Sequence, residues 1–302
     1  MFSTAERPVT TSRPRRLWLR IFLTGLALWV ASVAVTFWTS NTNLIPTIIL
    51  LGSFLVPVTF VVWAWQRQQA GEITPGLLFS TFVTGGVLGV LGASVLETFL
   101  LRPSWWLFLG VGLIEEAAKL AALAFVTRHL RVRSMRDGII LGAATGFGFA
   151  AFESAGYAFT ALFTTNGLSL SQVVETEVLR GLLAPFGHGL WTAIAGGALF
   201  ASSQDGHLRI TGRLVRAFLG VSLLHGLWDW MHVLVIRLTL ILTQGERYVP
   251  TAHGWIVQPT PEQARLVPTL EWSGMALLSV IGIIWLVAEW RSYRSAQARL
   301  LT

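Results

Sequence analysis

The chain has 302 residues, of which 53% are hydrophobic and 12% charged; its formal net charge is +7 and it contains no cysteine. A globular domain of this length would carry about 25% charged residues, so the composition excludes soluble enzymes and nucleic-acid-binding modules. Without cysteine, disulfides, thiolate metal ligands and cysteine nucleophiles are excluded as well. The apolar residues come in runs of about twenty, the length that crosses about 30 Å of hydrocarbon, and therefore predict an all-α, polytopic membrane helical bundle.

Eight apolar runs predict eight transmembrane helices. The first, at 17–38, ends in Phe37-Trp38-Thr39-Ser40 without a small-residue cleavage site, so we expect an uncleaved anchor rather than a signal peptide. Eight crossings leave both termini on one side, and most arginines fall there, so the positive-inside rule places both termini in the cytoplasm. The expected location is thus a cytoplasmic membrane of bacterial type. The remaining runs are 44–65, 74–100, 104–127, 138–163, 178–202, 214–240 and 269–290.

The chain is expected to be organised around its middle helices. The stretch 166–177 is amphipathic and predicted to lie outside the membrane. In the fifth run, small residues recur every four positions from Gly138 through Gly142 and Gly146, a stripe that lets helices approach closely. The predicted parts are a basic cytoplasmic N-terminus (1–16), three helices (17–103), a four-helix core (104–242), an irregular exterior loop (243–268), and a last helix with a cytoplasmic tail (269–302).

Charged side chains inside the predicted helices point to a functional site. Each costs about 2.5–3.5 kcal/mol to insert, and at 1.5 Å per residue those in the middle runs reach the central or outer half of the bilayer. His232 and Glu97, nearer to helix ends, are expected to form structural hydrogen bonds. The polar residues of the predicted site are Glu115, Glu116 and Lys119 in the fourth run, Glu153 in the fifth, His188 in the sixth, and His225 with Asp229 in the seventh.

Several of these residues recur at a spacing of four, which puts them on one helix face. Lys119 can pair with Glu115, and Asp229 can hold the second ring nitrogen of His225, which would fix its tautomer. Two further pairs with this spacing, Glu153 with Tyr157 and His188 with Thr192, are expected to support the site.

The residue types are those of a hydrolytic centre. Two histidines and one carboxylate suffice for a catalytic zinc ion, and Glu153, His188 and His225 would supply them from three helices. Either Glu115 or Glu116 would then be the general base on the bound water. No HExxH motif is present. A metal-free site, in which a buried glutamate paired with His188 activates water, uses the same residues and stays open.

A proton-coupled transporter is the alternative from another class, because such carriers also use buried Glu, Lys and His. A transporter predicts corresponding broken helices in its two halves. Here the polar groups are confined to the fourth to seventh runs, and Pro185 breaks the sixth run three residues before His188. The distribution therefore favours a hydrolase.

Three motifs carry a resemblance to a known family. Residues 115–119 match EExxK, residues 149–153 match FxxxE with Tyr157 following, and His188 and His225 occupy two later helices. Over roughly residues 104–232 this order resembles the PrsW family of intramembrane proteases, distant relatives of the CAAX prenyl proteases. The resemblance implies metalloprotease activity on a membrane-associated protein or peptide of the anti-sigma-factor type, with functional roles for Glu115, Glu116 and His188. Ser154 departs from the Asn that many members carry there.

Overall fold

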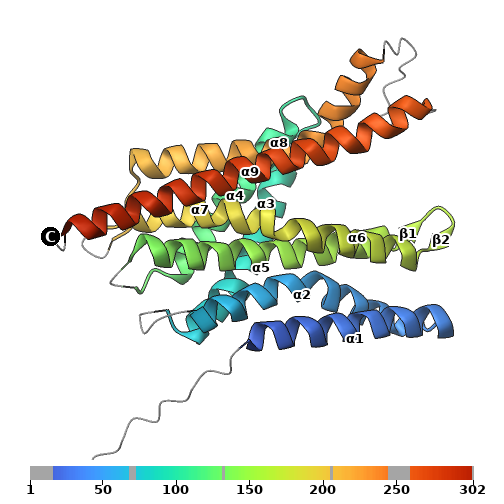
Figure 1. Ribbon diagram of the computed structural model, residues 1–302, viewed down its shortest axis with the longest axis horizontal. Helices are drawn as coiled ribbons and strands as arrows, with labels where there is room; N and C mark the ends of the chain where they lie inside the picture. Colours follow the sequence, from blue (N-terminus) through green and yellow to red (C-terminus); the bar gives the residue numbers. More distant parts are fainter. Residues whose placement is uncertain (1–15, 68–72, 131–132, 205–206, 244–258, 301–302) are drawn as a thin grey trace, which may run out of the picture.

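The computed structural model describes residues 16–67, 73–130, 133–204, 207–243 and 259–300, and these form a bundle of long helices (Figure 1). The predicted all-α membrane bundle is confirmed. In chain order the helices are α1 (Leu17–Thr39), α2 (Ile45–Arg67), α3 (Pro75–Leu100), α4 (Leu107–Val126), α5 (Met135–Ala161), α6 (Leu170–Leu183), α7 (His188–Ala201), α8 (Gly212–Leu242) and α9 (Pro261–Leu300), with 3-10 turns η1 (Thr42–Leu44) and η2 (Ala184–Phe186) and a small hairpin of β1 (Phe163–Thr164) and β2 (Gly167–Leu168).

Seven helical segments in the described ranges are long and apolar enough to cross a membrane, whereas the sequence predicts eight crossings. The difference is α4, because Glu115, Glu116 and Lys119 lie within its 20 residues. The helix nevertheless packs in the bundle, against α3 and α8. Its three charged side chains keep α4 out of the seven segments that qualify by composition. Burial against α3 and α8 accommodates these charges inside the bundle.

The predicted sixth helix is interrupted. Helix α6 begins at Leu170, the 3-10 turn η2 follows, and α7 starts at His188. Pro185 lies in this turn and has no N–H to continue an α-helix. The predicted boundary at 178 is wrong: residues 170–177 belong to α6, whose first turn is capped when the Ser169 side chain accepts the N–H of Gln172 at 3.4 Å.

The predicted irregular loop 243–268 is wrong in its last part, because α9 already begins at Pro261. Thr260 and Gln263 form a capping box: the N–H of Gln263 donates to Thr260 Oγ1 at 3.2 Å, and the N–H of Thr260 donates to Gln263 Oε1 at 3.1 Å. This arrangement starts a helix eight residues before the apolar run. Residues 244–258 lie outside the described residues, as does the basic N-terminus up to residue 15.

In Figure 1, α9 ends at the left of the bundle, and α1 begins at its own left-hand end, near the middle of the view. Arg67 ends α2 and Arg136 lies in the first turn of α5 at this same end. The cytoplasmic orientation of this end stays a prediction.

The small-residue stripe of α5 packs on α7, as the sequence predicts. A Cβ added at Gly142 would meet the backbone carbonyl of Thr192, and one at Gly146 would meet the carbonyl of His188. The two backbones are therefore in direct contact at the residue that begins α7, so α5 fixes the position of His188.

Gly146→Ala is expected to destabilise the protein by about 1–3 kcal/mol, the usual cost of overpacking, because the new methyl group meets the His188 carbonyl. Gly156→Ala, on the same helix but with nothing within 4 Å, is the matched control. It should be neutral or stabilising by up to about 1 kcal/mol, since alanine is the better helix former. Thermal unfolding in detergent micelles measures both, and equal shifts would argue against the close contact.

Candidate active site

Lys119 is the centre of a buried ionic network. Its side chain is fully buried, and Nζ lies 3.1 Å from Glu115 Oε2 and 2.8 Å from Glu116 Oε1. A third contact, of 2.8 Å, joins Nζ to Nδ1 of His188 on α7, and the Phe149 ring centroid lies 4.0 Å away. An ammonium has three N–H donors, and all three are used here. Lys119 thus offsets one of the two glutamate charges and joins α4 to α7.

His225 is held by Glu116 rather than by the predicted Asp229. Its Nδ1 lies 3.0 Å from Glu116 Oε1, and because a carboxylate only accepts hydrogen bonds, Nδ1 is assigned the proton. The buried Nε2 then carries a lone pair and has no hydrogen-bond partner within the described residues. Glu115 Oε2 is 3.5 Å from it and Asp229 Oδ2 is 3.4 Å from it. A buried acceptor between two carboxylates calls for a cation.

Glu115, His188 and His225 each offer one ligand atom within 4.8 Å of the others. Ligands of a tetrahedral zinc ion lie about 3.4 Å apart, given bonds of 2.0–2.2 Å. The separation of Glu115 Oε2 from His225 Nε2 is 3.5 Å and that from His188 Nδ1 is 3.8 Å. This donor set fits zinc, provided that Lys119 releases His188 Nδ1, which the ammonium now contacts.

The carboxylate in this group is Glu115, whereas the sequence predicts Glu153 as the metal-binding carboxylate. Glu153 lies on the other side of His188, with Oε2 3.0 Å from Nε2 of that ring. It also forms an ion pair with Arg180. The group of three donors found in the described part of the chain does not include it.

A cavity of about 420 Å³ opens beside these groups, within the range of ligand-binding pockets. Glu115, Glu153 and Asp229 line this cavity, whereas Glu116 is fully buried and does not line it. Glu97, which is expected from the sequence to form a structural hydrogen bond, also lines this cavity, and its Oε1 is buried without a partner in the described ranges. The remaining lining residues include His188, Arg180, Tyr157, Phe108, Phe149 and Trp228.

Arg180, on α6, is a site residue that the sequence analysis missed. Besides pairing with Glu153, it donates from Nε to Ser154 Oγ at 2.7 Å, and its guanidinium lies 4.3 Å from the centroid of the Tyr157 ring. Tyr157 therefore packs against Arg180, which in turn pairs with Glu153. The signal that could have found it is an arginine within the predicted run 178–202.

Two neighbours on α7 complete the surroundings of His225. Thr192 donates to Glu116 Oε2 at 3.1 Å, although its spacing had suggested a pair with His188. The ring of Trp191 stacks on that of His225, with centroids 4.7 Å apart. His232 lies outside this group, where its Nδ1 is 3.2 Å from Glu271 on α9, as expected of a residue that joins two helices.

Comparisons with known proteins show the family to which the chain belongs. Residues 74–252 match the family described as PrsW family intramembrane metalloprotease. Protease PrsW of Halalkalibacterium halodurans is 29% identical over 188 residues, covering 60% of this chain and 81% of the relative. Protease PrsW of Geobacillus kaustophilus is 27% identical over 168 residues, or 55% of this chain and 69% of the relative. No solved structure matches.

The family match begins at α3, thirty residues before the region in which the motifs indicate the resemblance, and it includes the four helices that carry the motifs. The transporter alternative is thereby set aside. Because the match covers more than half of the chain, the protein belongs to the PrsW family of intramembrane proteases and is an integral membrane hydrolase.

Proposed function

We propose that the protein is a metal-dependent endopeptidase that cuts a membrane-associated protein within the bilayer. The observation that carries this proposal is the group of Glu115, His188 and His225 beside a cavity of about 420 Å³. A substrate of the anti-sigma-factor type and a cytoplasmic membrane of bacterial type are the expectations that accompany it.

In this proposal Glu115, His188 and His225 hold one divalent ion, with zinc the best match to the donor types. When bound, such an ion polarises the scissile carbonyl and supplies a hydroxide-like water at neutral pH. His225 takes part through Nε2, the buried nitrogen without a hydrogen-bond partner in the described residues.

Glu116 acts as a positioning residue, which revises its predicted role as a general base. It is fully buried and does not line the cavity, so substrate and attacking water cannot reach it. Its two oxygens instead contact Lys119, His225 and Thr192. A carboxylate that accepts the N–H of a metal-binding histidine orients the ring and raises its basicity.

Glu153 is the proposed general base. It faces the cavity and lies beside His188, within reach of a water molecule that attacks a peptide bond there. Glu153 takes a proton from that water and returns it to the leaving amine. Arg180 holds the carboxylate in place through their ion pair.

The metal-free variant of this reaction rests on one specific observation. Lys119 already contacts Glu115, Glu116 and His188 Nδ1, so a cationic side chain lies where the donors would hold an ion. In that variant Glu153 and His188 activate the water, and His225 stabilises the oxyanion.

Metal removal separates the two variants. The purified protein, in detergent micelles, is assayed with a single-helix reporter peptide that carries a fluorophore and a quencher. We expect 1,10-phenanthroline to stop cleavage and zinc to restore it. The non-chelating isomer 1,7-phenanthroline is the control. Full activity of protein whose metal removal has been verified would favour the metal-free reaction.

A further inference from the structure

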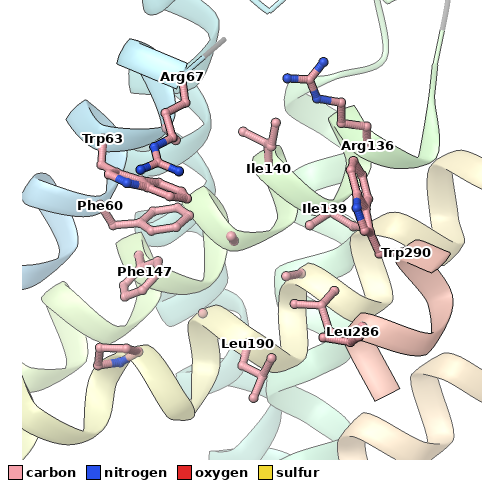
Figure 2. A pocket seen from close by; sticks show the side chains of 16 residues that line it. Phe60, Trp63, Arg67, Arg136, Ile139, Ile140, Phe147, Leu190, Leu286 and Trp290 are labelled. Carbon is pink, nitrogen blue, oxygen red and sulfur yellow. The ribbon is translucent and has the colours of Figure 1, made fainter. Parts of the chain in front are cut away.

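A second cavity, of about 500 Å³, lies between α2, α5, α7 and α9 (Figure 2) and shares no lining residue with the active-site cavity. Fourteen of its sixteen lining residues are apolar, glycine or proline, and the other two are Arg67 and Arg136. In Figure 2 both arginines lie at one end of the cavity, with Leu190 and Leu286 toward the other. The cavity is therefore amphipathic, with a cationic mouth and an apolar body.

Neither arginine forms an ion pair with an acidic residue in the ranges that the structure describes. Arg67 is exposed at the end of α2, with its guanidinium 4.8 Å from the centroid of the Trp63 ring. Arg136 lies in the first turn of α5 and is partly buried. Two guanidinium groups at one end of a cavity are suited to a phosphate, which they can bind with paired N–H donors.

We propose that this cavity binds a phospholipid with an anionic headgroup, with the phosphate between Arg67 and Arg136 and an acyl chain along the apolar body. Trp63 and Trp290 flank the mouth, and tryptophan is enriched at the level of lipid headgroups. Basic pockets between membrane helices at the cytoplasmic face are typical sites for such lipids.

The lining also argues against a peptide in this cavity. A peptide brings backbone N–H and C=O groups that must find partners inside a membrane. Phe60, Phe147, Leu190 and Leu286 have no polar side-chain atom to offer them. An acyl chain has no such requirement.

A lipid bound in this cavity would contact α9 as well as α2, α5 and α7. Leu286, Val287 and Trp290 bring α9 to the cavity, and Gly189 with Leu190 brings the start of α7. Gly189 directly follows His188. A lipid here would therefore fix α9 against α2 and α5 and steady the helix that carries a site histidine.

The test is lipid binding to delipidated protein, followed by native mass spectrometry. Phosphatidylglycerol is compared with phosphatidylcholine of the same acyl chains. We expect the wild-type protein to prefer phosphatidylglycerol by about tenfold or more, given the attraction of anionic lipid to two arginines, and Arg67→Gln/Arg136→Gln to lose this preference. The control is Arg20→Gln/Arg216→Gln, which removes two exposed arginines of α1 and α8 that do not line the cavity. This variant should keep the preference for phosphatidylglycerol.

A second variant tests the apolar body separately. Ala193→Leu narrows the cavity while both arginines stay, and should weaken binding of both lipids. Equal affinity of the wild-type protein for the two lipids would overturn the proposal, as would an unchanged preference in the Arg67/Arg136 variant. Displacement of the lipid by millimolar inorganic phosphate would overturn it too. So would a cross-linker placed at Ala143, which lines the cavity, if it captured a reporter peptide in place of lipid.

Discussion

Glu115→Gln and His225→Ala are each expected to abolish peptide-bond cleavage while the protein still inserts into the membrane. Each removes a donor from the group of three that is proposed to hold the ion. The activated water is then lost, and with it at least the roughly 10²–10⁴-fold that positioned proton transfer alone contributes. Initial rates on the reporter peptide, with folding checked by thermal unfolding, measure the loss.

The neighbouring carboxylates should respond to substitution in a graded way. Glu153→Gln should lower kcat by about 10²–10⁴-fold, as expected of a general base. Glu116→Gln keeps an acceptor for His225 and should cost only about 10–100-fold, the usual effect of a residue that orients a metal ligand. Glu177→Gln is the matched control, since Glu177 is buried outside the cavity and bonded to Ser53, and it should retain activity. If Glu115→Gln were as active as this control, the assigned donor set would be wrong.

Lys119→Met should produce the largest loss of stability. It leaves Glu115 and Glu116 buried without their counter-ion, and removal of one partner from a buried ion pair costs about 3–5 kcal/mol. Methionine keeps the length of the side chain, so the effect reports the charge rather than a cavity. The free energy of unfolding in mixed micelles measures it.

Arg213→Met provides the comparison for this loss. Arg213 pairs with Glu289 between α8 and α9, but both side chains are partly exposed, and exposed ion pairs contribute about 0–1 kcal/mol. A loss for Lys119→Met no larger than that for Arg213→Met would show that the buried network does not stabilise the fold.

The sequence predicts the bounds of a helix well where the length of an apolar run sets them. The first two predicted helices differ from α1 and α2 by at most two residues at each end, because lipid requires every buried backbone group to be bonded within a helix. Length alone cannot locate a break inside an apolar run, but the proline does: the 3-10 turn lies at Pro185, where the sequence predicts the interruption. The start of α9 depends on the side-chain cap at Thr260 and Gln263, which hydropathy does not register.

The sequence predicts which residues form the site better than it predicts which of them contact each other. The insertion cost of intramembrane charges singled out Glu115, Glu116, Lys119, Glu153, His188, His225 and Asp229, and the structure brings them together. Which carboxylate faces which histidine depends on how far each helix is rotated about its axis. Hydrophobic periodicity gives little information on that rotation in a helix that is apolar on nearly all sides. For this reason the sequence does not show that Glu115, rather than Glu153, shares a group with both histidines.

The most direct test of the proposed metal centre is the metal content of the detergent-purified protein, determined by elemental mass spectrometry after loading with zinc. We expect about one ion per chain in the wild-type protein and none in a folded His188→Ala/His225→Ala variant. No bound metal in the wild-type protein under these conditions, or one ion retained by the double variant, would contradict it.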